Sequence, residues 1–206
     1  MALHQDPGLT AQLINILNSP ACMAINFKWM DQQINSSGYQ DAVQALTAGK
    51  IGTGFANFSG GAKAGYVALN AGNPGAGLSG NTFYFDPTFT STDALSRVEA
   101  VHEATHAIQD LKGHRLMTVD EEGAAYFAGF LYNYYSPKQS QFPKTQMNNE
   151  LWKVASGVAE IWGSDPPGDR TVSNAMMNAI VLALNSDPRF AAEVKRMPFV
   201  DNDGVP

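Results

Sequence analysis

The stretch that decides the fold is residues 88–113, TFTSTDALSRVEAVHEATHAIQDLKG. It opens on residues 90–93, Thr-Ser-Thr-Asp, which are residue types that cap the N-termini of helices. It closes on Gly113, the residue type that most often follows a helix C-terminus. Apolar or small residues recur between these signals at helical spacing, at Leu95, Val98, Val101, Thr105 and Ile108. We therefore predict one long helix with a buried stripe.

Polar residues form a second stripe on the same predicted helix, at Glu99, His102, Glu103, His106 and Asp110. His102 and His106 are four residues apart, so they lie about one turn apart on the same face of the helix, and both imidazoles can point at one place. Two histidines at this spacing bind Zn²⁺ in HExxH proteins, and the glutamate after the first histidine acts as a base toward a metal-bound water. The competing interpretation is an ordinary helix with a solvated polar face.

A catalytic zinc site has three protein ligands, and the third is not given by the HExxH stretch itself. The continuation HExxHxxGxxH is absent, so a carboxylate is expected, and the candidates are Asp110, Asp120, Glu121 and Glu122. Asp110 lies one turn beyond His106, which suits an orienting contact to that histidine better than a metal bond. Thr118 and Glu121 fit a capping box at the start of the next helix, which leaves Glu122 as the favoured ligand.

HEATH followed by EEGAAYFAG resembles the zincin metallopeptidases, and among them the gluzincin type, in which a glutamate on a second helix completes the metal site. Within that type it is similar to compact bacterial zinc peptidases, which have small residues and an aromatic–alanine pair after the ligand glutamate. The resemblance covers residues 81–135, about a quarter of the chain. It implies that His102, His106 and Glu122 bind one Zn²⁺ ion and that Glu103 is the general base.

The resemblance also implies that the strand before the active-site helix, Thr82, Phe83, Tyr84 and Phe85, lies at the edge of a sheet beside the cleft. Such an edge can pair with an extended peptide substrate. The sequence departs from the thermolysin-like pattern, because Tyr126 stands four residues after Glu122 where that pattern has an aspartate. Asp110 and Glu121 are the candidates for the missing contact to a ligand histidine.

The residue that stabilises the oxyanion of the reaction is left open by the sequence. His114, Tyr132, Tyr134 and Tyr135 are the candidates, because each carries a hydrogen-bond donor near the motif in the chain. Core packing is the competing role for the tyrosines.

Outside the motif the chain divides into four regions. Residues 1–48 are predicted as helices, at 7–18, 20–35 and 39–48, and residues 49–86 as a glycine-rich region of short strands and turns. Residues 88–135 contain the HExxH helix and a second helix at 119–135, and residues 148–196 are predicted as C-terminal helices, at 148–162, 172–184 and 188–196. We expect a single α+β domain, rich in helix, with a small glycine-rich sheet beside the active-site helix.

Composition narrows the partners of the chain. The formal net charge is −6 over 206 residues, and no basic cluster is present, so we do not expect nucleic-acid binding. The single cysteine, Cys22, excludes an internal disulfide and a cysteine-based zinc site. No signal peptide or membrane-spanning run is apparent, so a cytoplasmic location or export by a signal-independent route is expected.

The sequence thus predicts a zinc-dependent hydrolase, foremost a metallopeptidase that cleaves a peptide or protein substrate. Two alternatives remain at this point. One is an exported effector or toxin peptidase with a single protein target. The other is a non-enzymatic interaction domain with a structural metal or none.

Overall fold

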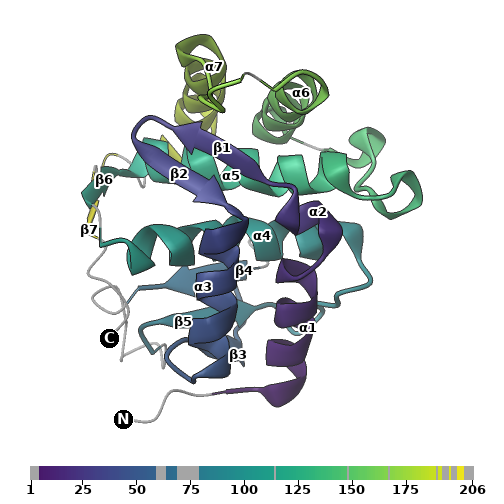
Figure 1. The fold of residues 1–206 in the computed structure, drawn as a ribbon, viewed down its shortest axis with the longest axis vertical. Coiled ribbons are helices and arrows are strands. Elements are labelled where there is room, and N and C mark those ends of the chain that lie inside the picture. The colour runs from purple at the N-terminus through teal and green to yellow at the C-terminus, as the bar shows by residue number, and fades with distance from the viewer. Residues whose placement is uncertain are drawn as a thin grey trace.

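Two long helices form the centre of the molecule, as seen in the computed structural model (Figure 1). The structure describes residues 5–58, 64–68, 79–113, 115–147, 149–166, 168–188, 190–191, 195 and 199–201. Helix α4 (Ala94–Leu111) and helix α5 (Thr118–Tyr135) have 18 residues each and pack side by side. The short strand β6 (Arg115–Met117) lies between them in the chain. The two helices that contain the motif and its predicted third ligand are therefore neighbours in space.

The N-terminal region is only partly helical. Helix α1 (Pro7–Leu17) confirms the first predicted helix, with the Asp6 side chain accepting a hydrogen bond from the Leu9 amide. The predicted helix at 20–35 is wrong beyond its first turn. Helix α2 (Pro20–Met23) is followed by an antiparallel hairpin of β1 (Asn26–Trp29) and β2 (Gln32–Asn35). Helix α3 (Ser36–Thr47) then begins three residues before the predicted position.

The hairpin forms because its apolar residues alternate rather than follow a helical period. Phe27 and Trp29 are fully buried on β1, and Ile34 is fully buried on β2 opposite Phe27. The intervening residues point the other way, as the period of two in a strand requires. Met30 makes the turn with a φ of 52°.

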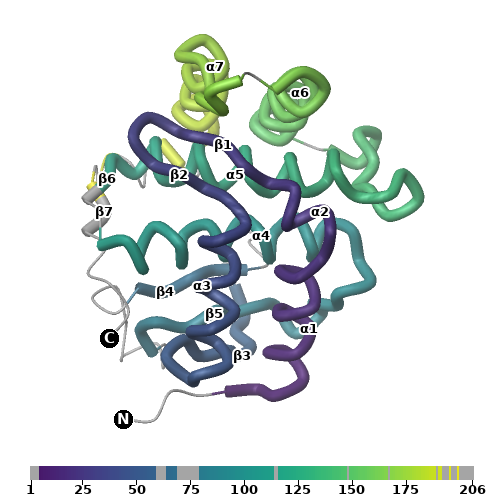
Figure 2. The backbone as a smooth tube through the Cα atoms, in the orientation of Figure 1, coloured from purple at the N-terminus to yellow at the C-terminus, as the bar shows by residue number. Residues whose placement is uncertain are grey.

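The glycine-rich region forms the predicted small sheet, with strands β3 (Gly52–Phe55), β4 (Ala64–Val67) and β5 (Thr82–Phe85). Their order is β3-β5-β4, with β3 parallel and β4 antiparallel to β5. The prediction that Thr82, Phe83, Tyr84 and Phe85 form an edge strand is therefore wrong. All four residues are buried, because β5 is the central strand and is covered by a neighbour on each side. The strand that lies along α4 is β4 (Figure 2).

The C-terminal region supplies the layer on the far side of α5. Helix α6 (Glu150–Ser164) and helix α7 (Asn174–Ser186) confirm two predicted helices, and both pack on α5 (Figure 1). Two 3-10 turns, Lys138–Ser140 and Lys144–Gln146, lie between α5 and α6. The predicted helix at 188–196 falls largely outside the described residues. Strand β7 (Phe199–Asp201), which was not predicted, pairs antiparallel with β6.

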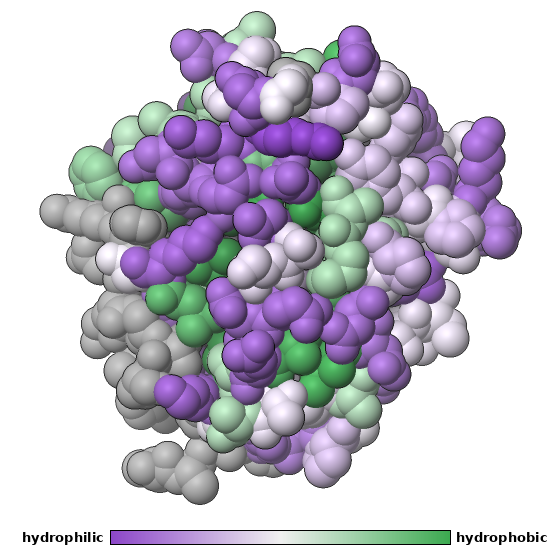
Figure 3. Space-filling view, in the orientation of Figure 1, coloured by the Kyte–Doolittle hydropathy of each residue, from purple (hydrophilic) through white to green (hydrophobic). Residues whose placement is uncertain are grey.

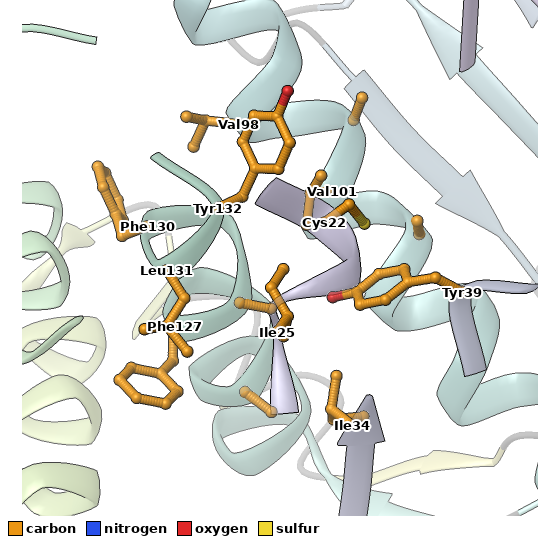
Figure 4. Close-up of a cluster of buried hydrophobic side chains, with 14 of the residues drawn as sticks. Cys22, Ile25, Ile34, Tyr39, Val98, Val101, Phe127, Phe130, Leu131 and Tyr132 are labelled. Atoms are coloured by element: carbon orange, nitrogen blue, oxygen red, sulfur yellow. The ribbon is translucent and has the colours of Figure 1, made fainter. Parts of the chain in front are cut away.

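One hydrophobic core unites these layers, so the chain forms a single α+β domain, as predicted. Figure 4 shows part of this core, where Cys22, Ile25 and Tyr39 of the N-terminal region meet Val101 of α4 and Leu131 of α5. Polar side chains cover most of the face drawn in Figure 3, with apolar patches between them. Within the part of the chain that the structure describes, no helix is both long and apolar enough to cross a membrane.

Candidate metal centre

Helix α4 holds the HExxH residues in the predicted way. Asp93 is its N-cap and accepts a hydrogen bond from the Ser96 amide, and Gly113 follows its C-terminus with a φ of 63°. His102 and His106 lie on one face of the helix, with their Nε2 atoms 3.1 Å apart. Both imidazoles therefore point the same ring nitrogen at one place.

The polar stripe of α4 is not a solvated surface. Glu103 and His106 are 8% and 9% exposed, and Asp110 is fully buried. Charged residues are rarely buried this far unless they are paired or bind a metal. The interpretation of the stripe as an ordinary solvated helix face is therefore wrong.

Glu122, on the first turns of α5, completes a triangle with the two histidines. One carboxylate oxygen, Oε2, lies 3.4 Å from His102 Nε2, and the other, Oε1, lies 3.6 Å from His106 Nε2. Zinc binds four ligands at about 2.0–2.1 Å in a tetrahedron, which separates neighbouring ligand atoms by about 3.3–3.4 Å. The two Nε2 atoms lie 3.1 Å apart, and each faces a different oxygen of the Glu122 carboxylate at a distance close to this spacing.

The Oε2 atom of Glu122 is also a buried polar atom that accepts no hydrogen bond of normal geometry from the described residues. A buried carboxylate oxygen that accepts no hydrogen bond of good geometry is costly, unless a nearby positive charge compensates its own charge. The donor set and this oxygen together fit a metal ion at the triangle.

Glu121 does not cap α5 as predicted, but it makes the contact to a histidine of the motif for which it was one of two candidates. The N-cap of α5 is Met117, Thr118 is already the first helical residue, and no side chain caps the helix. The predicted capping box is therefore wrong, because β6 runs directly into the helix and leaves Thr118 no non-helical position. The Glu121 carboxylate instead lies 3.4 Å from His106 Nδ1, the ring nitrogen that does not face the triangle.

The carboxylates around His106 control its protonation. Burial lowers the pKa of His106, but Glu122, Glu121 and Glu103 outweigh burial and raise that pKa from 6.5 to about 10. Burial opposes the ionisation of Glu122, but the charge of His106 and the imidazole of His102 outweigh it and hold the pKa of Glu122 below its ordinary value. The site thus favours a positive charge at its centre. A proton and a metal ion compete for that position, since histidine must be neutral to bind a metal.

Glu103 lies beside the triangle rather than in it. Its Oε1 atom is 3.9 Å from His102 Nε2, and its Oε2 atom accepts a hydrogen bond of 2.7 Å from the backbone amide of Tyr66 on β4. His102, Glu103 and His106 together form a compact group of potential metal-binding atoms, all within 4.8 Å of one another. The contact with β4 occupies one oxygen of Glu103 and leaves the other on the side of the histidines.

Close packing sets the position of α5 against α4. A side chain at Gly129 would place its Cβ 2.9 Å from the backbone oxygen of Val98 and 3.6 Å from His102 Cβ. Gly123, directly after Glu122, likewise lies against the indole of Trp29 on the hairpin, which a Cβ would approach to 2.7 Å. These two glycines allow α5 to bring Glu121 and Glu122 to the histidines.

Aromatic rings cover one side of the site. Tyr126, one turn after Glu122, packs edge-on against the His102 ring with centroids 4.4 Å apart, and Phe190 packs on Tyr126 at 5.7 Å. Tyr126 therefore supports His102 by ring contact at the position where the thermolysin-like pattern has an aspartate.

Asp110, the other residue predicted to contact a histidine of the motif, accepts a hydrogen bond of 2.8 Å from the Tyr66 hydroxyl.

Three of the four candidate residues for stabilising the oxyanion lie too far from Glu122. Tyr132, Tyr134 and Tyr135 follow Glu122 by ten or more residues on α5, which is about 15 Å or more along the helix axis. The fourth, His114, lies outside the described residues.

Sequence reasoning missed Tyr66, which contacts two residues of the polar stripe. The only signal was the short apolar run YVAL between glycine-rich segments, which indicates a strand but not its neighbour. Comparison of the chain with protein families, curated proteins and solved structures found no match.

Proposed function

We propose that the chain is a zinc-dependent hydrolase of the metallopeptidase type, with His102, His106 and Glu122 as the metal ligands. The observation that carries the proposal is the convergence of two imidazoles and one carboxylate: the Nε2 atoms lie 3.1 Å apart, and the two Glu122 oxygens lie 3.4 and 3.6 Å from them. Two imidazoles and one carboxylate are a donor set that suits Zn²⁺, and three protein ligands leave one position for water or substrate. Structural zinc sites, in contrast, use four protein ligands.

The residues around the triangle match the roles of a hydrolytic site. A bound zinc ion would supply Lewis acidity, lowering the pKa of a water molecule and polarising the carbonyl of the substrate. Glu103 would serve as the general base, accepting a proton at Oε1, the oxygen on the histidine side, and donating it to the leaving amine. Glu121 accepts a hydrogen bond from His106 Nδ1 and so keeps Nε2 free as the ligand atom.

The order of these residues in the chain supports the gluzincin type within the zincins. Two histidines and the base come from one helix, and the third ligand comes from the adjacent helix, in the arrangement that the resemblance implies. A peptide bond is the proposed target, because that type consists of peptidases. The zinc requirement is one ion per chain.

The first test measures cleavage of a complex peptide mixture by mass spectrometry of the new termini. Zinc-loaded wild type is compared with Glu103→Gln, and with Glu150→Gln as the matched control, since Glu150 lies exposed at the start of α6. We expect new termini with wild type and with Glu150→Gln. The rate should fall by about 10²- to 10⁴-fold in Glu103→Gln, because the general base is lost.

Zinc content is measured in all three proteins, and we expect it to be equal because Glu103 is not a ligand. Equal cleavage by wild type and Glu103→Gln would contradict the role of Glu103. Zinc-loaded wild type that cleaves nothing in the mixture would contradict a general peptidase and favour a hydrolase with a single target or a non-enzymatic metal domain.

A further inference from the structure

Tyr66 on strand β4 makes two hydrogen bonds with side chains of helix α4. Its backbone amide donates to Glu103 Oε2 at 2.7 Å, so this amide points away from β5 and toward α4. Its hydroxyl donates to Asp110 Oδ2 at 2.8 Å, two turns further along α4. Its ring packs on Phe83 of β5 with centroids 5.0 Å apart. The sheet and the helix therefore fix Tyr66 from both sides.

We propose that Tyr66 is a positioning residue that holds the general base Glu103 in its working orientation. The inference rests on the proposed function, since it assigns Glu103 as the base. The proposed contact adds a residue of strand β4, outside the HExxH motif, to the site. The group that acts is the backbone amide of Tyr66 and not its side chain.

The need for such a contact follows from the glutamate side chain. The terminal torsion of a glutamate carboxylate is broad and roughly two-fold, so the side chain alone does not decide which way its oxygens face. The Tyr66 amide donates to Oε2 of Glu103. The other oxygen, Oε1, then faces the two histidines and lies 3.9 Å from His102 Nε2. Hydrogen bonds to a charged acceptor are stronger than neutral ones, so one amide is enough to select this orientation.

A backbone amide is well suited to this task. The pairing of Gly65 with Tyr84 and of Val67 with Thr82 holds the strand on both sides of Tyr66. The hydroxyl bond to Asp110 prevents the strand from sliding along α4. The donor is therefore fixed before substrate binds, and no side-chain freedom is lost when it acts.

The contact is tested by NMR with [¹⁵N]tyrosine, which labels only the seven tyrosine amides of the chain. Tyr66→Phe removes one signal and so assigns Tyr66. In zinc-loaded wild type, the Tyr66 amide proton should lie downfield, as expected for a short hydrogen bond to a carboxylate. Glu103→Ala should move it upfield, whereas the control Glu150→Ala should leave it unchanged.

The role in catalysis is tested by replacing the Tyr66 amide with an ester, through incorporation of the α-hydroxy analogue of tyrosine. This change removes the donor and keeps the side chain. With a peptide cleaved in the test above, we expect kcat to fall by about tenfold or more with KM nearly unchanged, because the lost interaction acts on the base and not on substrate binding. Zinc affinity should be unchanged, and the control Glu150→Gln, on the exposed start of α6, should keep the wild-type kcat.

The outcomes separate this inference from the proposed function. A Tyr66 amide that does not respond to Glu103→Ala in a zinc-loaded protein overturns the positioning role and leaves the hydrolase standing. An ester variant with wild-type kcat overturns it as well. An amide that responds in a protein that never binds zinc overturns both, since Glu103 then has no reaction to serve.

Discussion

At the residue scale, the site concentrates negative charge in a buried place. Glu103, Glu121 and Glu122 surround two imidazoles, and the nearest polar atoms of the group lie 3.1–3.9 Å apart. Such a group needs a compensating positive charge, because the cost of burying like charges is high. The raised pKa of His106 reflects the same demand, met by a proton when no metal is bound.

Glu121 gives a prediction at this scale. Glu121→Gln keeps the size of the side chain but weakens its hydrogen bond with His106 Nδ1, which lies 3.4 Å from Oε1. We expect zinc affinity to fall by about 10- to 100-fold, as is typical when the partner of a ligand histidine is changed. Competition with a chromophoric chelator measures the affinity. Glu160→Gln, on the exposed side of α6, is the control, and an unchanged affinity in Glu121→Gln would rule out the contact.

The sequence predicted the residues of the site better than their roles. His102, Glu103, His106 and Glu122 lie together because the spacing of residues on α4 and the phase of α5 are local properties that a sequence shows. The role of Glu121 depends on whether Thr118 caps α5. Strand β6 runs directly into α5 and makes Thr118 a helical residue, which the local sequence of the helix does not show. Tyr66 is 37 residues from Glu103 in the chain, and no local pattern indicates such a contact.

At the scale of elements, the distance between α4 and α5 determines whether Glu122 meets His102 and His106. Gly129 makes this approach possible, because α5 crosses α4 there with no room for a Cβ. The HExxH helix was predicted almost to its ends, since its caps are in the sequence. The hairpin was missed because a strand period of two was taken for a helical period, and the order of the sheet was missed because pairing partners are far apart in the chain.

Gly129→Ala tests this packing. The new Cβ would lie 2.9 Å from the Val98 backbone oxygen, so α5 must move away from α4. We expect a loss of about 1–3 kcal/mol in the free energy of unfolding, measured by urea denaturation, together with weaker zinc binding. Gly157→Ala in α6 is the matched control, because nothing lies within 4 Å of its Cβ position.

In the control, alanine should stabilise the helix by about 0.5–1 kcal/mol, since glycine is the poorer helix former. Equal effects of the two substitutions would show that α4 and α5 do not approach each other as closely as described.

At the scale of the whole molecule, one core connects the N-terminal region to both helices of the site. Cys22 reports on that core, because it is fully buried and packs with residues of α3, α4 and α5. Burial raises the pKa of the Cys22 thiol far above its ordinary value, which leaves almost no reactive thiolate near neutral pH. Composition predicted a single domain of this kind, but the order of its layers depends on contacts between distant segments.

We therefore expect Cys22 to resist a thiol reagent such as DTNB at pH 8 in the folded protein and to react fully in denaturant. The rate of reaction should rise with urea in parallel with global unfolding, since no local opening exposes a residue at the centre of the core. Rapid labelling of the native protein would contradict the described core.

The central claim is that α4 and α5 together hold one zinc ion, and metal content tests it most directly. Protein purified without chelator or affinity tag is incubated with zinc, desalted and measured by plasma mass spectrometry, for wild type, His106→Ala, Glu122→Gln and the control Glu150→Gln. We predict about one zinc ion per chain in wild type and control, little or none in His106→Ala, and a reduced amount in Glu122→Gln. Wild type without zinc, or zinc retained in full by both ligand variants, would contradict the claim.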